Sequence, residues 1–297
     1  MNRLEGQRGF CGETADLRLA FAGIHKGEEP PITGAGGSGT IFVSGCNLGC
    51  AFCQNYQLSK GKPLSKESIG RAVSQEEFAE TCLALEKHGA ENINIVTGSH
   101  AAPALALGIT ASRKKGLSIP VLWNSSGYDG MESLEILKDL VDVYLPDLKT
   151  MDSNFAEKFF NAANYPVQAE AAILKMMEYR ELRLDETMLS GVMVRHLVIP
   201  GFLENTRQVL AWFVEHCKGK ALLSLMTQYT PVGTDPTIPG RYISEDEYKA
   251  VLSMLDEFGI DDGFCQELVT GSDWLPDFTK ANPFSSELSV PVWHYKL

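Results

Sequence analysis

Short β-branched apolar runs alternate along this chain with amphipathic runs of helical period, and the alternation repeats six times. We expect strands at residues 40–43, 93–96, 121–123, 141–145, 192–199 and 222–226. Helical patterns occupy residues 74–89, 103–115, 132–140, 155–179, 206–217 and 244–259. Strand–helix repeats of this kind predict a parallel sheet with right-handed crossovers. Six units are fewer than the eight of a complete barrel, so we expect an α/β fold built as an open, partial (β/α)6 barrel.

Two of the expected helices carry clear end signals. Ser74 and Ser244 each precede a helical pattern, and each has a glutamate three residues later, Glu77 and Glu247, as in a capping box. Gly259 is placed to end the second of these helices.

The residues that follow the six expected strands are mostly polar. Barrel enzymes place their sites at the carboxyl ends of the strands. Five of the six strand ends are polar or rich in cysteine, which predicts a cavity suited to a polar cofactor. The six segments are residues 46–53, 97–100, 124–126, 147–149, 200–201 and 228–230.

The cysteines are unevenly distributed. The chain has seven, at positions 11, 46, 50, 53, 82, 217 and 265. The odd number, without an export signal, argues against a disulfide framework. Cys46, Cys50 and Cys53 lie within eight residues in the spacing Cys-x3-Cys-x2-Cys. Three thiolates on one loop can bind three corners of a 4Fe-4S cluster and leave the fourth iron open to a small molecule.

Other interpretations of the three cysteines fit less well. Structural zinc takes four ligands, and a second cysteine pair is absent from the sequence. An electron-transfer ferredoxin supplies a fourth cysteine at set spacing. A thioredoxin-type pair could use Cys50 and Cys53 but would not need Cys46. Three ordinary buried cysteines remain the simplest alternative.

The motif Cys46-x3-Cys50-x-Phe52-Cys53 resembles the signature of the radical S-adenosylmethionine (SAM) superfamily, with Phe52 in its aromatic position. Further segments are similar to the pyruvate formate-lyase-activating-enzyme-like branch: residues 37–42, 44–48, 54–56, 194–201, 224–229 and 275–278. The resemblance implies a 4Fe-4S cluster and SAM as cofactors. In such enzymes the fourth iron binds the amino and carboxylate groups of SAM.

The resemblance also implies roles for residues at the strand ends. Thr97, Gly98 and Ser99 occupy the turn that binds the SAM amino group, although Gly98 could equally serve a tight turn for its backbone angles. Asn124 and Ser126 stand where the family has a residue that contacts the SAM ribose.

Three other positions complete the expected cofactor site. Asp147 and Lys149 match an Asp-x-Lys motif of the activating enzymes, and Lys149 is a suitable partner for the SAM carboxylate. Tyr229 stands where the branch has a histidine near the ribose. His196, within the fifth strand, we interpret as a hydrogen-bonded core histidine. No catalytic residue is assigned.

The resemblance implies a radical SAM oxidoreductase that removes a hydrogen atom from a substrate, of the type that activates glycyl radical enzymes and acts on a protein. The alternatives are radical SAM chemistry on a small molecule or peptide, and a non-catalytic iron–sulfur electron carrier. The expected electron donor is a flavodoxin or a ferredoxin.

Composition narrows the remaining possibilities. The net charge is -12 and the pI about 5.0, which argues against non-specific binding of nucleic acid. No apolar run is long enough for a membrane span. The first residues lack the apolar stretch of a signal peptide, so we expect a cytoplasmic protein without a membrane partner.

We expect three parts along the chain: an N-terminal lead-in at residues 1–38, the barrel at 39–260, and an extension at 261–297 that packs on the barrel. Residues 28–31, two glutamates followed by two prolines, are interpreted as an extended linker. The glycine run at residues 34–39 precedes a strand and is not a phosphate loop. Cys11 receives no role.

Overall fold

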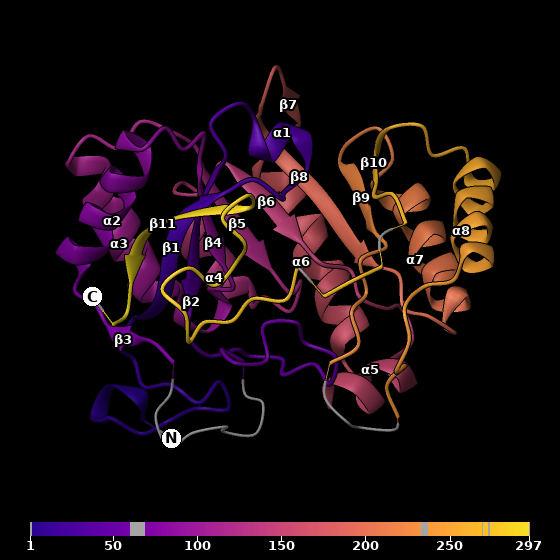
Figure 1. Ribbon diagram of the computed structural model, residues 1–297, viewed down its shortest axis with the longest axis horizontal. Coiled ribbons are helices and arrows are strands. Elements are labelled where there is room, and N and C mark those ends of the chain that lie inside the picture. The colour runs from indigo at the N-terminus through magenta and orange to yellow at the C-terminus, as the bar shows by residue number, and fades with distance from the viewer. Residues whose placement is uncertain (1, 60–68, 233–236, 269, 273, 297) are drawn as a thin grey trace.

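A computed structural model describes residues 2–59, 69–232, 237–268, 270–272 and 274–296 (Figure 1). Its described strands form one mixed sheet in the order β10-β9-β8-β6-β5-β4-β2-β1-β11. The short strands β3 and β7 pair with β1 and β8 beside this path.

Six adjacent parallel strands make up the centre of the sheet. They are β2 (Ser38–Val43), β4 (Ile93–Val96), β5 (Val121–Ser125), β6 (Val143–Pro146), β8 (Met188–Leu197) and β9 (Leu222–Met226). These are the six strands that the sequence predicts, and the partial (β/α)6 barrel is thereby confirmed. Their residues are almost entirely buried, as expected for parallel strands covered on both faces.

The sheet extends beyond the predicted strands at both edges. At one edge β1 pairs antiparallel with β2 and with β11, and at the other β10 pairs parallel with β9. The added strands are β1 (Arg18–His25), β3 (Arg71–Ala72), β7 (Arg183–Leu184), β10 (Gly263–Cys265) and β11 (Ser289–His294). Residues on either side of the predicted barrel, at 1–38 and 261–297, therefore contribute strands to the same sheet.

Most of the helices lie on the outside of the sheet (Figure 1). They are α2 (Gln75–Lys87), α3 (Ala102–Lys114), α4 (Met131–Leu137), α5 (Ser153–Phe160), α6 (Tyr165–Tyr179), α7 (Leu203–His216) and α8 (Glu245–Phe258). The single turn α1 (Pro30–Thr33) instead packs on the inner face of the sheet, where its Ile32 is buried with Leu122 and Val143. Two 3-10 turns precede β1 and α3, at Arg3–Glu5 and Ser99–Ala101. Side chains such as Phe78, Trp123 and Phe213 are fully buried between helices and sheet.

The predicted end signals are only partly used. At α8 the complete capping box forms between Ser244 and Glu247, and Gly259 ends the helix in the left-handed region with a φ of 58°. At α2 the hydroxyl of Ser74 accepts the backbone N–H of Glu77, but the Glu77 carboxylate accepts from Arg71 instead of returning to Ser74.

The prediction of an extended linker at residues 28–31 is wrong. Pro30 opens the single turn α1, where a proline fits because the first helical N–H has no partner within the helix. The side chains of Glu28 and Glu29 turn inward to Arg195 on β8. The sequence alone could not show this inward turn, because the buried Arg195 that pairs with the two carboxylates lies far away in the chain.

Between β10 and β11, the two edges of the sheet, the described residues 266–268, 270–272 and 274–288 cross the open side of the partial barrel, and we call them the crossing segment (Figure 1). Described side chains hold this crossing segment in place. Gln266 accepts from the backbone N–H of Thr227 at 3.1 Å, and the backbone N–H of Phe278 donates to Gln57 at 2.7 Å. Phe278 is fully buried and packs edge-on against Phe42 of β2, with ring centroids 5.0 Å apart.

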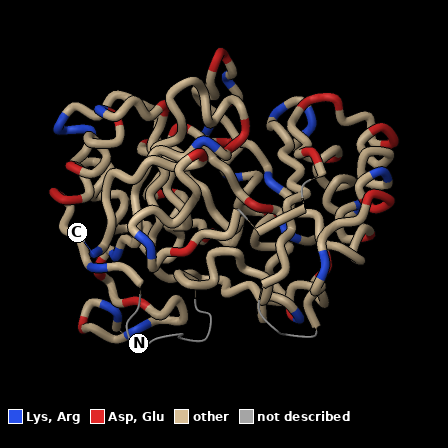
Figure 2. The backbone as a smooth tube through the Cα atoms, viewed as in Figure 1, with Lys and Arg blue, Asp and Glu red and all other residues tan. Residues whose placement is uncertain are grey.

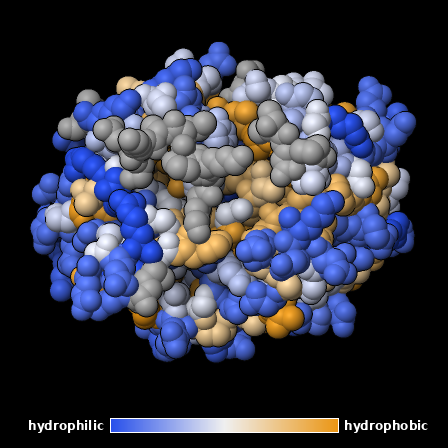
Figure 3. All heavy atoms as spheres, turned by 90° about the horizontal axis from the view of Figure 1, so that it is seen from below, coloured by the Kyte–Doolittle hydropathy of each residue, from blue (hydrophilic) through white to orange (hydrophobic). Residues whose placement is uncertain are grey.

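Charged residues of both signs are interspersed along the outer helices (Figure 2). The face at the carboxyl ends of the parallel strands shows apolar residues in a band across its centre, with hydrophilic residues around it (Figure 3). None of the helices in the described part of the chain combines the length and the apolar character needed to cross a bilayer.

Candidate active site

A cavity of about 280 Å³ lies on the inner side of the curved sheet and reaches the carboxyl ends of the parallel strands. Nine of the twelve site residues predicted from the sequence line it: Cys46, Cys50, Phe52, Cys53, Thr97, Asn124, Ser126, Asp147 and Lys149. The fold thus brings together segments from the ends of β2, β4, β5 and β6. The other three predicted residues, Gly98, Ser99 and Tyr229, do not line the cavity.

The cysteine loop at residues 46–53 follows β2 and is tied to neighbouring strand ends. Asn47 donates from its side-chain nitrogen to the carbonyl of Tyr128 at 2.7 Å. Gln54 donates in the same way to the carbonyl of Gln228 at 3.0 Å. These bonds fix the loop against segments that follow β5 and β9, so the three sulfurs are presented to the cavity by a braced backbone.

Phe52 fills the aromatic position of the motif and is buried. Its ring centroid lies 5.8 Å from Phe160, 5.9 Å from Phe159 and 6.3 Å from Tyr229. Packing of this kind between tilted rings adds to the stabilisation from buried area. The side chain between the second and third cysteines therefore anchors the loop on α5.

The chemistry of the three sulfurs suits metal ligation. Burial raises the pKa of the Cys50 thiol, and Lys149 opposes this shift through its positive charge. Burial likewise raises the pKa of Cys53. The Cys46 sulfur accepts the backbone N–H of Leu48 at 3.4 Å. Iron that binds the sulfurs takes the place of the thiol protons. The sulfurs then need not be buried as free thiolates, which would be costly.

Within the described residues, no three His, Cys, Asp or Glu side chains are arranged to hold a single metal ion. A 4Fe-4S cluster differs from a single ion because each cysteine binds a different iron, so its sulfurs stand farther apart. Three cysteines that line one cavity and share one loop fit such a cluster.

Asp147 and Lys149 form an ion pair at the end of β6, with 2.5 Å between carboxylate oxygen and ammonium nitrogen. Burial lowers the pKa of Lys149, but the charges of Asp147 and Cys50 outweigh it and hold the pKa above its ordinary value. The hydroxyl of Tyr165 lies 2.8 Å from the carbonyls of both Ser126 and Asp147 and accepts the N–H of Lys149 at 3.0 Å. Tyr165, which the sequence did not single out, thus joins the ends of β5 and β6.

The turn after β4 has a structural role in side-chain packing, in addition to any role in binding a ligand. Gly98 has an ordinary φ of -97°, so its backbone angles do not require glycine. A Cβ at this position would clash with Leu105 Cδ1 and would lie 2.8 Å from Trp123 Cη2. Glycine is favoured here because the side chains of Leu105 on α3 and Trp123 on β5 pack directly against it. Ser99 is buried outside the cavity, whereas Thr97 faces into it.

Tyr229 is buried, and its hydroxyl donates to the carbonyl of Pro239 at 2.8 Å. The neighbouring Gln228 lines the cavity instead.

His196 is fully buried, as predicted for a core histidine. Its Nδ1 lies 2.7 Å from the carbonyl of Leu148 and its Nε2 lies 3.1 Å from the Thr206 hydroxyl. Burial lowers the pKa of His196 to about 4.

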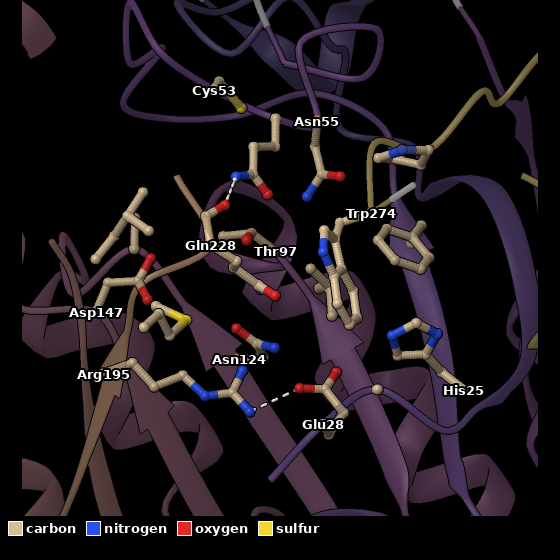
Figure 4. Close-up of a pocket in the computed structure, with 18 of the residues that line it drawn as sticks. His25, Glu28, Cys53, Asn55, Thr97, Asn124, Asp147, Arg195, Gln228 and Trp274 are labelled. Atoms are coloured by element: carbon tan, nitrogen blue, oxygen red, sulfur yellow. Dashed lines mark hydrogen bonds and ion pairs between the residues drawn. The ribbon is translucent and has the colours of Figure 1, made fainter. Parts of the chain in front are cut away.

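The cavity has a second polar region that the sequence did not reveal as a site. Glu28, Glu29 and Arg195 line it, and we call them the carboxylate–arginine cluster. Arg195 Nη2 lies 2.7 Å from Glu28 Oε2 and also pairs with Glu29. His25 and the crossing segment, through Trp274, add to the same wall (Figure 4). No local pattern reveals the pairing itself, because Arg195 lies 167 residues from Glu28.

Comparisons with known proteins agree with this geometry. The sequence model of the Radical SAM superfamily matches residues 40–213. An uncharacterized protein of Methanocaldococcus jannaschii is 28% identical over 262 residues, which cover 86% of this chain and 72% of that protein.

Among solved structures, Streptococcus suis SuiB bound to S-adenosylmethionine aligns with a TM-score of 0.54 at 13% identity, covering 75% of this chain and 48% of SuiB. HydG, a maturase of the [FeFe]-hydrogenase, aligns with a TM-score of 0.56 at 14% identity, covering 78% of this chain and 52% of HydG. This chain therefore spans about half the length of either protein, and the likeness is one of fold.

Proposed function

Because this chain belongs to the radical SAM superfamily, we propose that it is an enzyme that cleaves SAM reductively and removes a hydrogen atom from a substrate. Members of the superfamily are enzymes that use a 4Fe-4S cluster and SAM. The observation that carries the proposal is the placement of Cys46, Cys50 and Cys53 in one cavity with Asp147 and Lys149.

The cysteines would hold the cluster at three corners. When bound, the cluster and SAM together supply a 5′-deoxyadenosyl radical and methionine after one electron is delivered. Lys149 stands beside Cys50 and would pair with the SAM carboxylate through a charge-assisted hydrogen bond. Asp147 keeps this ammonium group in place.

The remaining polar residues of the cavity would orient the rest of SAM. Thr97 and Asn124 lie at the ends of β4 and β5, beside each other in the sheet, and both face the cavity. Their hydroxyl and amide groups can bond to the amino group and the ribose. Phe52 would act indirectly, by holding the cysteine loop on α5.

For the substrate, we favour a compact molecule or a short peptide over a folded protein. The crossing segment covers the open side of the barrel with Trp274, Phe284 and Leu288. The solved structures with similar folds include SuiB bound to its precursor peptide SuiA. The resemblance to the activating-enzyme branch implies a protein substrate instead. Deuterium transfer from labelled candidates into 5′-deoxyadenosine separates the two.

The test of the function is SAM cleavage. Protein reconstituted without oxygen and reduced with dithionite should form 5′-deoxyadenosine and methionine slowly, even without substrate. SAM should also change the paramagnetic resonance spectrum of the reduced cluster. An intact, reducible cluster that yields no 5′-deoxyadenosine would leave the electron carrier as the better account. The expected physiological donor is a flavodoxin or a ferredoxin.

A further inference from the structure

The carboxylate–arginine cluster lies in the cavity at the end away from the cysteines. Figure 4 shows Cys53 at one end and Glu28 with Arg195 at the other, with Thr97 and Asn124 between them. The side chains of the cluster are 6% to 13% exposed. Ionised groups this deeply buried are costly unless they are paired and hydrogen-bonded.

The charges of the cavity do not balance. Among the described residues that line it, Glu28, Glu29 and Asp147 are acidic, and Arg195 and Lys149 are basic. Three negative and two positive charges leave one negative charge. Asp147 and Lys149 neutralise each other, so the excess belongs to the carboxylate–arginine cluster.

Two further polar atoms at this end lack a partner. Arg195 Nε and His25 Nδ1 are buried and make no hydrogen bond to any described residue. Arg195 itself is only 5% exposed, and both residues line the cavity. Burial holds the pKa of His25 below its ordinary value, so its ring brings no positive charge to offset the excess. The site therefore offers a negative charge, an N–H donor and a histidine ring nitrogen to a ligand.

We propose that the carboxylate–arginine cluster binds a substrate through a positively charged amino group, and that Arg195 Nε donates to an oxygen atom of the same molecule. The ammonium group supplies the missing positive charge beside Glu28 and Glu29. Ammonium hydrogens are donors only, which leaves Arg195 Nε for a hydroxyl, carbonyl or carboxylate oxygen. The substrate class is thus a small oxygen-containing amine or an amino-acid side chain.

This assignment rests on the proposed function, because it places the amine in the cavity that would also hold SAM. The crossing segment closes this end from the side. Trp274 extends into the cavity near His25, and the Phe284 ring lies 4.8 Å from the His25 ring (Figure 4). Exclusion of water by these rings strengthens the attraction between an ammonium group and the buried carboxylates.

The experiment measures binding to protein loaded with the cluster and SAM, by titration calorimetry without oxygen. Three probes share a four-carbon frame: 4-aminobutan-1-ol, butane-1,4-diol and 4-hydroxybutanoate. We expect the amine to bind at least tenfold more tightly than either of the others. Nα-acetyl-lysine amide serves as a fourth probe, and its preference over 4-aminobutan-1-ol would identify a peptide side chain as the source of the amine.

Substitutions then locate the site. Glu28→Gln removes one charge with little change in shape and should weaken amine binding at least tenfold, as should Glu29→Gln. Glu77→Gln is the control. It breaks the ion pair between Glu77 on α2 and Arg71 on β3, outside the cavity, and should leave amine binding unchanged.

Several results would overturn the assignment. One is that the amine and the diol bind equally well, or that 4-hydroxybutanoate binds best. Another is that both glutamine variants bind the amine as tightly as the unchanged protein. A third is that Glu28→Gln lowers the affinity for SAM and not the affinity for the amine. Formation of 5′-deoxyadenosine without amine is measured in parallel. If that reaction is absent while amine binding still depends on Glu28, the proposed function fails and the amine site stands.

Discussion

Gln54, directly after the cysteine loop, donates a hydrogen bond to the backbone carbonyl of Gln228, 174 residues later in the chain. The bond joins the segment after β2 to the segment after β9, which lie on opposite sides of the parallel core in the order of the sheet. One side chain thus spans the mouth of the barrel and links its two sides.

Replacement of Gln54 by alanine should lower the free energy of unfolding by about 0.5–1.5 kcal/mol, since one hydrogen bond is lost. Urea denaturation monitored by circular dichroism measures the change. Asn282→Ala is a suitable comparison, because its side chain also donates to a backbone carbonyl, that of Ser289, away from the cysteine loop. Only the Gln54 variant should also lose its cluster faster to a chelator. Equal rates of loss in both variants would show that the bond does not brace the loop.

Cys50→Ala should abolish the absorbance of the reconstituted 4Fe-4S cluster, because two cysteines cannot hold three corners. Cys82→Ala is the matched control. Cys82 is buried in α2, outside the cavity, so its loss should leave iron and sulfide content unchanged. A full cluster in the Cys50 variant would refute the ligand assignment.

Lys149→Ala should weaken SAM binding by about 1.5–3 kcal/mol, which corresponds to the loss of a hydrogen bond between charged groups. Lys158→Ala removes an exposed lysine on α5 and should have no effect. Equilibrium dialysis with labelled SAM gives both affinities, and the cluster spectrum shows whether the site is intact. Equal affinity in the two variants would mean that Lys149 serves only Asp147.

His196 should make stability depend on pH in a defined window. In the folded state its pKa is about 4, below the ordinary 6.5, so the unfolded chain binds the proton first. The contribution of neutral His196 to the free energy of unfolding is fully present above pH 6.5. It is lost as the pH falls toward 4, by at most about 1.4 kcal/mol per pH unit. Urea unfolding at several pH values measures the slope, and His196→Gln should reduce it. An unaltered slope in that variant would assign the dependence to other groups.

Gly98→Ala should destabilise the protein by about 1–3 kcal/mol, since the added methyl group meets Leu105 and Trp123. Gly240→Ala is the control, because a Cβ added there would meet nothing within 4 Å and the site is exposed. Thermal unfolding compares the two. A Gly98 variant as stable as the Gly240 variant would show that α3 can shift away at no cost.

The parallel core could be read from the sequence because its signals are local. Residues 93–96 and 222–226 are short apolar runs, and β4 and β9 occupy those same positions. The antiparallel strand β1 was missed although most of its residues are buried, since its pairing with β11 joins distant segments.

The candidate site divides in the same way. Cys46, Cys50 and Cys53 are close in sequence and were identified by their spacing. Glu28 and Arg195 are 167 residues apart, and neither has a neighbour in the sequence that reveals the pairing. Lone charged residues within apolar segments are the signal that could have drawn attention to Arg195, which the fifth strand carries among Val and Leu residues.

The crossing segment also has a consequence for how the protein is made. Synthesis on the ribosome proceeds from the N-terminus, and folding begins during synthesis. All six parallel strands and the cysteine loop leave the ribosome before residues 266–288 do. Until those residues are added, the growing chain lacks the segment that covers the open side of the cavity, so the cysteine loop is made before its cover.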